Sequence, residues 1–223
     1  MIIESRYNGP AGSGNGGYSA GLFAVNSGLT GDALEVTLRL PPPLEVDLQV
    51  RSSEGGADVY AGDAVVAQVR PAVVAPDDVV APVGWDEAVA ASAHYAGFTS
   101  HPFPTCFVCG PERAEGDGLR LFPGRLPDGR TATPWVVPDD ISPELVFAAL
   151  DCPGGWAVPL EGRPYVLGRL AVRIVRRPRT THRCVVMGEM TGEDGRKAFA
   201  RTTLYDHDGT VLALARSTWI ALQ

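Results

Sequence analysis

The chain has 223 residues, a formal net charge of −7 and an apolar fraction of 45%, so it is long enough for one large domain or two small ones. The acidic balance argues against a general nucleic-acid-binding protein. No apolar run is long enough to cross a bilayer, and the N-terminus lacks the basic and apolar regions of a signal peptide. We therefore expect a cytoplasmic protein that binds neither nucleic acid nor membrane.

The first part of the chain predicts a strand, a helix and then about four strands. The opening strand candidate is Ile2–Tyr7, and a Gly-rich loop follows at residues 8–17. Apolar residues at helical spacing predict a helix from Tyr18 to Val25. Apolar and polar residues then alternate as in half-buried strands. These strands are predicted at residues 34–40, 46–50, 57–61 and 64–69.

The middle of the chain is a connection between two halves. A Pro- and Asp-rich segment at Asp77–Val83 precedes an Ala-rich helix at Asp86–Tyr95, and Ser100–Gly118 is irregular. We divide the chain into an N-terminal repeat at residues 1–84, a linker with a helix and a CxxC pair at 85–117, and a C-terminal repeat at 118–223.

A buried helix is predicted in the second half, within Ser142–Trp156. Ser142 suits the N-cap and a proline follows at the first helical position. Leu145–Leu150 leaves almost no polar face, so other structure should surround the helix. Asp151 ends this run, and Gly154-Gly155 is expected to stop the helix. Strands are predicted at residues 119–122, 131–137, 165–175, 183–190, 197–205 and 211–221.

Both halves therefore read as a helix combined with a series of strands, which favours an internal duplication. A weak echo supports it, because VVAQVR at Val65–Arg70 matches VLALAR at Val211–Arg216. Residues 15–22, NGGYSAGL, resemble the GG-x-x-A segment that opens the central helix in acyl-CoA thioesterases of the double-hotdog superfamily. Residues 150–155, LDCPGG, resemble the acid-bearing helix of the same superfamily, although the His-Gly-Gly opening of some members is missing.

The resemblance implies an α+β fold of two tandem hotdog repeats, each with a central helix wrapped by an antiparallel sheet. It also implies a thioester hydrolase, whose substrate is an acyl-CoA or acyl-carrier thioester and which needs no cofactor. The superfamily includes dehydratases and hydratases as well. A 3-hydroxyacyl-thioester dehydratase and a non-catalytic protein that binds acyl thioesters or other apolar ligands therefore stay open as alternatives. A homodimer is plausible.

Asp151 is the candidate catalytic residue, because a carboxylate on an apolar helix must find a partner or shift its pKa. It would act as a general base on water or attack the thioester directly. The amides of Gly16 and Gly17, at the positive end of the first helix, are expected to bind the substrate carbonyl. Asn15 is either a further donor or only the N-cap. Thr202 and Thr203 are candidates for positioning the water.

Each of these residues also has a purely structural interpretation. Asp151 would then hydrogen-bond the glycine turn that follows it, and Gly16-Gly17 would be a flexible entry to the helix. The segment Gly17–Gly21 matches G-x-S-x-G, but the nucleophile elbow needs a preceding buried strand and a parallel sheet. Trp135, Trp156 and Trp219 would line an acyl pocket or the core. Six arginines between residues 169 and 183 would meet coenzyme A phosphates or solvent.

The pair Cys106 and Cys109, with His101 nearby, is the candidate for a metal site. A structural zinc needs four ligands, usually as two paired sets, and the set is incomplete along the sequence. Cys152 is isolated in the sequence, although the fold could bring it to the pair. We therefore predict no metal, with an ordinary buried turn as the expected role of the CxxC segment.

Overall fold

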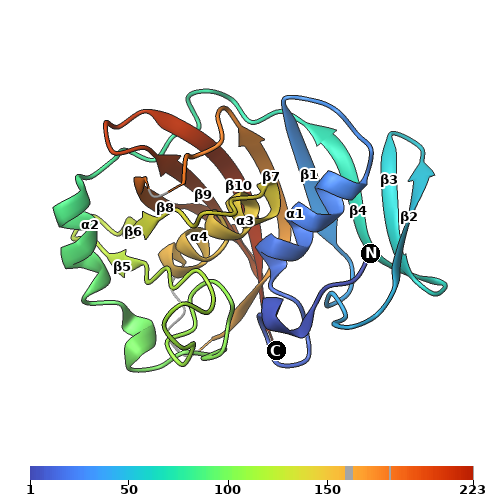
Figure 1. The fold of residues 1–223 in the computed structure, drawn as a ribbon, viewed down its shortest axis with the longest axis horizontal. Helices are drawn as coiled ribbons and strands as arrows, with labels where there is room; N and C mark the ends of the chain where they lie inside the picture. The colour runs from blue at the N-terminus through green and yellow to red at the C-terminus, as the bar shows by residue number, and fades with distance from the viewer. Residues whose placement is uncertain (159–162, 181, 223) are drawn as a thin grey trace.

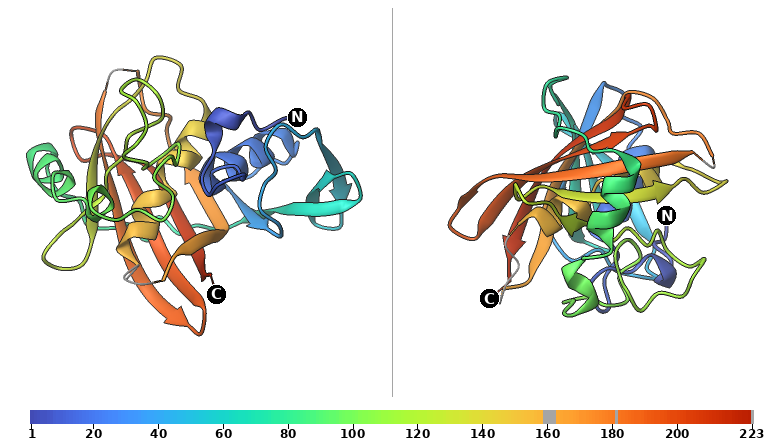
Figure 2. Two further views of the ribbon diagram at one scale, coloured as in Figure 1. Left: turned by 90° about the horizontal axis from the view of Figure 1, so that it is seen from below. Right: turned by 90° about the vertical axis from the view of Figure 1, so that its left-hand side faces the viewer.

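The structure is a computed structural model that describes residues 1–158, 163–180 and 182–222. Within these residues, ten strands form one antiparallel sheet in the order β2-β3-β4-β1-β7-β10-β9-β8-β6-β5. The sheet curves around three helices on one of its faces (Figure 1). These are α1 (Gly16–Asn26), α3 (Pro143–Ala149) and α4 (Cys152–Ala157). Figure 2 shows the same wrapped helices from two further directions.

The two halves of the sheet have the same connectivity. In each half, three strands form a meander and the strand that follows the central helix pairs with the last strand of that meander. In the first half these strands are β1 (Ala33–Leu38), β2 (Leu48–Ser53), β3 (Gly56–Ala61) and β4 (Ala64–Ala72). In the second half they are β7 (Tyr165–Ile174), β8 (Arg183–Asp194), β9 (Lys197–Tyr205) and β10 (Val211–Ala221). The predicted α+β duplication is therefore confirmed.

The halves join through β1 and β7, with Val36 opposite Leu170. The short strands β5 (Gly124–Arg125) and β6 (Thr131–Val136) extend the sheet beyond β8, and α2 (Trp85–Ser92) packs against that edge. The sheet continues across this junction without a break. The division of the chain at residues 84 and 117 stays a prediction.

Two predicted strands are wrong. Within Ile2–Tyr7 the structure has a 3₁₀ turn, η1 (Ser5–Tyr7), instead of a strand. A further 3₁₀ turn, η2 (Ala96–Phe98), follows α2. Residues 119–122 form no strand, because the amides of Leu119 and Leu121 bond to the irregular linker instead of to a neighbouring strand. The N–H groups of Leu119 and Leu121 donate to the carbonyls of Phe107 and Val108.

The predicted helix around Asp151 is interrupted. Asp151 N–H donates to the carbonyl of Ala148, and Gly154 N–H donates to that of Asp151, so the hydrogen bonds span three residues instead of four. Pro153 has no N–H with which to continue the α-helical pattern. The helix therefore divides into α3 and α4 at Asp151.

Gly154 and Gly155 lie inside α4, so the expectation that they stop the helix is wrong. Their role is close packing against the sheet. A Cβ on Gly154 would lie 2.7 Å from Thr202 Oγ1, and one on Gly155 would lie 2.6 Å from the Trp219 ring. Neither position has room for a larger side chain.

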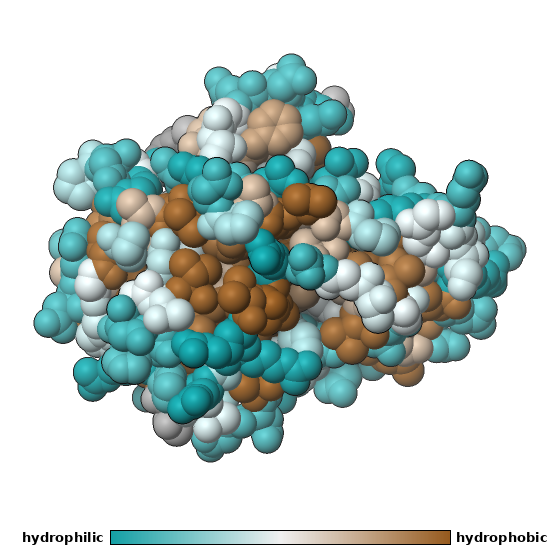
Figure 3. Space-filling view, turned by 90° about the horizontal axis from the view of Figure 1, so that it is seen from above, coloured by the Kyte–Doolittle hydropathy of each residue, from teal (hydrophilic) through white to brown (hydrophobic). Residues whose placement is uncertain are grey.

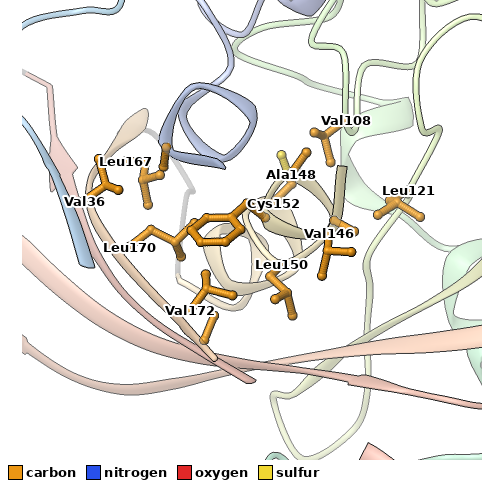
Figure 4. Close-up of a cluster of buried hydrophobic side chains, with 14 of the residues drawn as sticks. Val36, Val108, Leu121, Val146, Ala148, Leu150, Cys152, Leu167, Leu170 and Val172 are labelled. Carbon is orange, nitrogen blue, oxygen red and sulfur yellow. The ribbon is translucent and has the colours of Figure 1, made fainter. Parts of the chain in front are cut away.

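The central helices of the two repeats cross at close range. A Cβ on Gly17 would lie 2.4 Å from Asp151 Cβ, and one on Gly21 would lie 2.7 Å from Glu144 Cα. The two glycines are four residues apart, so they lie on one face of α1 and let α3 approach its backbone. Below the crossing, apolar side chains from α3, α4 and both halves of the sheet form one core (Figure 4).

No helix among the described residues is long and apolar enough to span a membrane. On the face of the molecule seen in Figure 3, apolar side chains lie toward the middle and polar side chains surround them. Several large apolar side chains are exposed, including Val73, Val136 and Val175. Homodimerisation, which the sequence allows without requiring it, stays a prediction.

Candidate functional site

Asp151 lies between α3 and α4 with its side chain directed at the start of α1. It is only 2% exposed. Its Oδ2 accepts hydrogen bonds from Gly17 N–H at 2.8 Å and from Asn15 Nδ2 at 3.0 Å. Its Oδ1 is buried and has no hydrogen-bond partner among the described residues. One oxygen is thus held by the first repeat, and the other is left without a partner.

Burial is the main influence on the acidity of Asp151. Burial and the nearby Cys106 raise the pKa of the carboxyl group, the hydrogen bonds from Gly17 and Asn15 lower it, and the net result is a pKa of about 7. A carboxyl group with this pKa exists in both protonation states near neutral pH. It can therefore accept and return a proton under physiological conditions.

Asn15 performs two tasks at once. Its Oδ1 accepts a 2.8 Å hydrogen bond from Tyr18 N–H, which is the expected N-cap of α1. Its Nδ2 donates to Asp151 and also lies 3.7 Å from Cys106 Sγ. The same side chain therefore begins the helix and orients the acid.

The two glycine amides differ in their surroundings. Gly17 N–H is engaged by Asp151, which differs from the expectation that both amides face the substrate. Gly16 lines the cavity described below, and in the described part of the chain its amide has no acceptor. As the first residue of α1, it presents an N–H group that the helix itself leaves unsatisfied. Carbonyl binding by either amide stays a prediction.

Asp151 and Gly16 line a cavity of about 400 Å³ between the two repeats. Most of its walls are apolar, because Leu167, Trp156 and Trp219 contribute to them. Of the three tryptophans considered from the sequence, Trp135 does not line it. Arg39, which sequence reasoning missed, is the one arginine or lysine among the described lining residues.

The threonine candidates do not line this cavity. Thr203 Oγ1 accepts a 2.9 Å hydrogen bond from Val80 N–H, and Thr202 faces α4 at Gly154. Ser19, the serine of the G-x-S-x-G match, is buried within α1. Because a loop precedes α1 and the sheet is antiparallel, no nucleophile elbow is formed. The arginines between residues 169 and 183 are likewise absent from the described lining.

Three cysteines meet in the wall of the cavity next to Asp151. The Sγ atoms of Cys106, Cys109 and Cys152 all lie within 4.8 Å of one another. His101 Nε2 lies 3.3 Å from Cys109 Sγ. Hydrogen bonds from Cys109 and Cys152 hold the pKa of the Cys106 thiol well below its usual range. The fold thus brings Cys152 to the CxxC pair, a possibility that the sequence left open.

Together, the fold and the site define a double-hotdog protein with a buried acid at the junction of its repeats. Searches of the sequence against models of protein families and against curated proteins find no match.

Solved structures of the same architecture match over nearly the whole chain. A proposed thioesterase from Novosphingobium aromaticivorans is 15% identical with a TM-score of 0.64, and the match covers 100% of this chain and 94% of that one. A hot-dog-fold protein of unknown function from Alicyclobacillus acidocaldarius is 14% identical with a TM-score of 0.59, at coverages of 100% and 92%. The tesB protein of Mycobacterium avium subsp. paratuberculosis is 12% identical with a TM-score of 0.58, at 96% and 89%. At these identities the likeness concerns the fold, and it confirms the predicted double hotdog.

Proposed function

We propose that the protein hydrolyses an acyl thioester, carried by coenzyme A or by an acyl-carrier protein, with Asp151 as the general base. The observation that supports this most directly is the asymmetry of the Asp151 carboxylate. Oδ2 is fixed by two donors, whereas Oδ1 is buried, has no hydrogen-bond partner within residues 1–158, 163–180 and 182–222, and belongs to a residue that lines the cavity. An oxygen in this state has the free lone pair that a base needs.

In the proposed reaction, Oδ1 takes a proton from a water molecule while the water oxygen bonds to the thioester carbon. The carbonyl oxygen becomes negative and is stabilised by the amide of Gly16 at the positive end of α1. When the tetrahedral intermediate collapses, the C–S bond breaks, and the thiolate receives the proton from Asp151. The products are a carboxylic acid and a thiol.

The remaining walls of the cavity suit such a substrate. Trp156, Trp219 and Leu167 provide an apolar surface for an acyl chain. Arg39 is exposed at the cavity, where a guanidinium group suits the phosphates of coenzyme A or of a phosphopantetheine arm. Two of the matched structures described above are a proposed thioesterase and a tesB protein, which agrees with this substrate class.

The test is thiol release from a panel of acyl-CoA thioesters of different chain length. We expect the D151N variant to lose roughly 10²–10⁴-fold in rate, the usual contribution of a general base. E144Q, which changes an acid on α3 that does not line the cavity, is the matched control and should keep its rate. An unchanged rate in D151N would exclude this mechanism.

A single turnover in ¹⁸O-labelled water separates the two possible roles of the acid. With a general base, the label enters the released carboxylic acid and not the Asp151 side chain. With direct attack, an anhydride forms, and its hydrolysis can leave ¹⁸O on the Asp151 carboxylate. Thioester binding without thiol release would favour the non-catalytic alternative, and the appearance of an enoyl absorbance would favour a dehydratase.

A further inference from the structure

We propose that Cys106, Cys109 and Cys152 form a zinc-binding site in which three thiolates hold the metal and the fourth position opens to the cavity. The assignment of this metal site does not rest on the proposed hydrolysis, although both share one cavity. It uses residues from two separated parts of the chain, the linker and the first turn of α4.

The positions of the sulfur atoms are close to those that zinc requires. Zinc bonds to cysteine sulfur at about 2.3 Å in tetrahedral geometry, which places pairs of sulfur atoms about 3.8 Å apart. The three Sγ atoms here lie within 4.8 Å of one another, so small side-chain rotations bring them to that spacing. All three cysteines are free and almost fully buried, with exposures of 4%, 3% and 6%.

The backbone of the CxxC turn also fits a metal-binding loop. Gly110 N–H donates to the Cys106 carbonyl at 2.9 Å, which closes the turn. A Cβ on Gly110 would lie 2.5 Å from the Cys106 nitrogen, so only glycine allows this closed turn. The closed turn keeps the sulfur atoms of Cys106 and Cys109 within 4.8 Å of each other, as a pair of metal ligands requires.

Two further donors surround the cluster. Asn15 Nδ2 lies 3.7 Å from Cys106 Sγ, and His101 Nε2 lies 3.3 Å from Cys109 Sγ. Three thiolates and one divalent cation carry a net charge of −1, and these donors face that charge. The same hydrogen bonds are the outer-shell interactions that usually accompany metal ligands.

The hydrogen bonding of His101 identifies it as a donor instead of a fourth ligand. Its Nδ1 accepts a 2.8 Å hydrogen bond from Phe103 N–H, so Nδ1 carries no proton. In a neutral imidazole the proton is then on Nε2, and that nitrogen faces Cys109 Sγ. A metal-bound nitrogen has to be unprotonated, so the fourth position is left for water or a ligand from the cavity, whose lining includes all three cysteines.

The metal would connect the linker to the helix that follows Asp151. Cys106 and Cys109 lie in the irregular segment after η2, and Cys152 is the first residue of α4. Bound zinc would therefore fix the linker against the acid-bearing turn. Its contribution to stability should appear as a metal-dependent rise in the melting temperature.

The test is to measure bound zinc in the full-length protein, purified under reducing conditions and dialysed against a competing chelator. We expect about one zinc per chain, following the single-site stoichiometry. Cobalt substitution should give a sulfur-to-metal charge-transfer band and the visible bands of a tetrahedral site. Addition of a small thiol should shift those bands, because the fourth position is open. A wild-type protein that holds no zinc or cobalt would overturn the proposal.

Variants define the ligand set. C152S should lose the zinc and the cobalt spectrum, whereas C184A, which changes the buried cysteine outside the cluster, should keep both. H101Q should also keep the metal, and its loss there would overturn the three-cysteine assignment. Should C152S fold poorly, melting curves of C109S with and without zinc provide the same test, with no metal-dependent shift expected. A stable disulfide within the cluster under reducing conditions would also contradict the proposal.

Discussion

Gly17 N–H, near the start of the first central helix, donates a 2.8 Å hydrogen bond to Oδ2 of Asp151, at the break in the second. The two residues are 134 positions apart in the chain. Their contact therefore exists only because the two repeats place their central helices side by side. The contact leaves Oδ1 as the free oxygen of the acid, and most of the following predictions depend on it.

The close contact at Gly17 should make this position intolerant of any side chain. In G17A the new Cβ would lie 2.4 Å from Asp151 Cβ and 2.9 Å from the Phe147 carbonyl oxygen, so the helices have to separate. We expect a loss of about 1–3 kcal/mol in the free energy of unfolding, measured by urea denaturation. G192A, where no atom of the residues that the structure describes lies within 4 Å of the added Cβ, should differ from wild type by less than about 0.5 kcal/mol.

The buried charge of Asp151 should make stability depend on pH. Its folded-state pKa of about 7 lies above the usual 3.8, so burial favours the protonated form. The stabilisation is complete below about pH 4 and is lost as the pH rises to about 7. Relative to D151N, wild type should therefore lose on the order of a few kcal/mol in unfolding free energy over this range. The measurement is urea denaturation of chelator-treated wild type and D151N at several pH values. A difference in unfolding free energy that stays constant with pH would contradict the prediction.

The same pKa predicts the pH dependence of thioester hydrolysis. A general base works only as the carboxylate, so kcat/KM of the chelator-treated protein should rise with pH and level off above a midpoint of about 7. A rate that is already maximal at about pH 5 would mean that Asp151 has the acidity of an ordinary carboxyl group.

Variants of Asn15 should distinguish its role as the N-cap of α1 from its effect on the pKa of Asp151. In N15D the cap for Tyr18 N–H is retained, but a second carboxylate replaces the donor to Asp151, so the midpoint of the kcat/KM profile should move to higher pH. In N15S the hydroxyl can still cap the helix, whereas the donor to Asp151 is lost. Its midpoint should also rise, by less than in N15D because no negative charge is added. An unchanged midpoint in both variants would show that the Asn15 contact does not influence the acid.

Arg39 should contribute to substrate binding without taking part in the chemistry. Loss of one guanidinium–phosphate contact at an exposed site should raise KM for acyl-CoA several-fold and leave kcat nearly unchanged. R51A, which changes an exposed arginine that stacks on Tyr60, is the control and should keep both constants. A large fall in kcat for R39A would show that Arg39 acts in the reaction itself.

The sequence by itself determined the type and order of most elements. Alternating apolar residues identified β1 and strands of the meanders, because a strand buried on one face carries an apolar residue at every second position. The matching order of elements in the two halves indicated the internal duplication. The apolar run before Asp151 identified a buried helix and singled out its acid. The pattern could not show that Pro153 divides this helix, or that Gly154 and Gly155 serve packing against Thr202 and Trp219.

Only the tertiary structure decided how the site is assembled. The contacts of Asp151 with Gly17 and Asn15, and the meeting of Cys152 with the CxxC pair, join segments that are remote in the sequence. Such contacts depend on the sheet that wraps both helices, and the pairing of β1 with β7 makes this sheet continuous across the two repeats. The surroundings of a buried carboxylate determine its pKa and decide which of its two oxygens is left without a hydrogen bond. These properties therefore follow from packing between the repeats and not from local sequence.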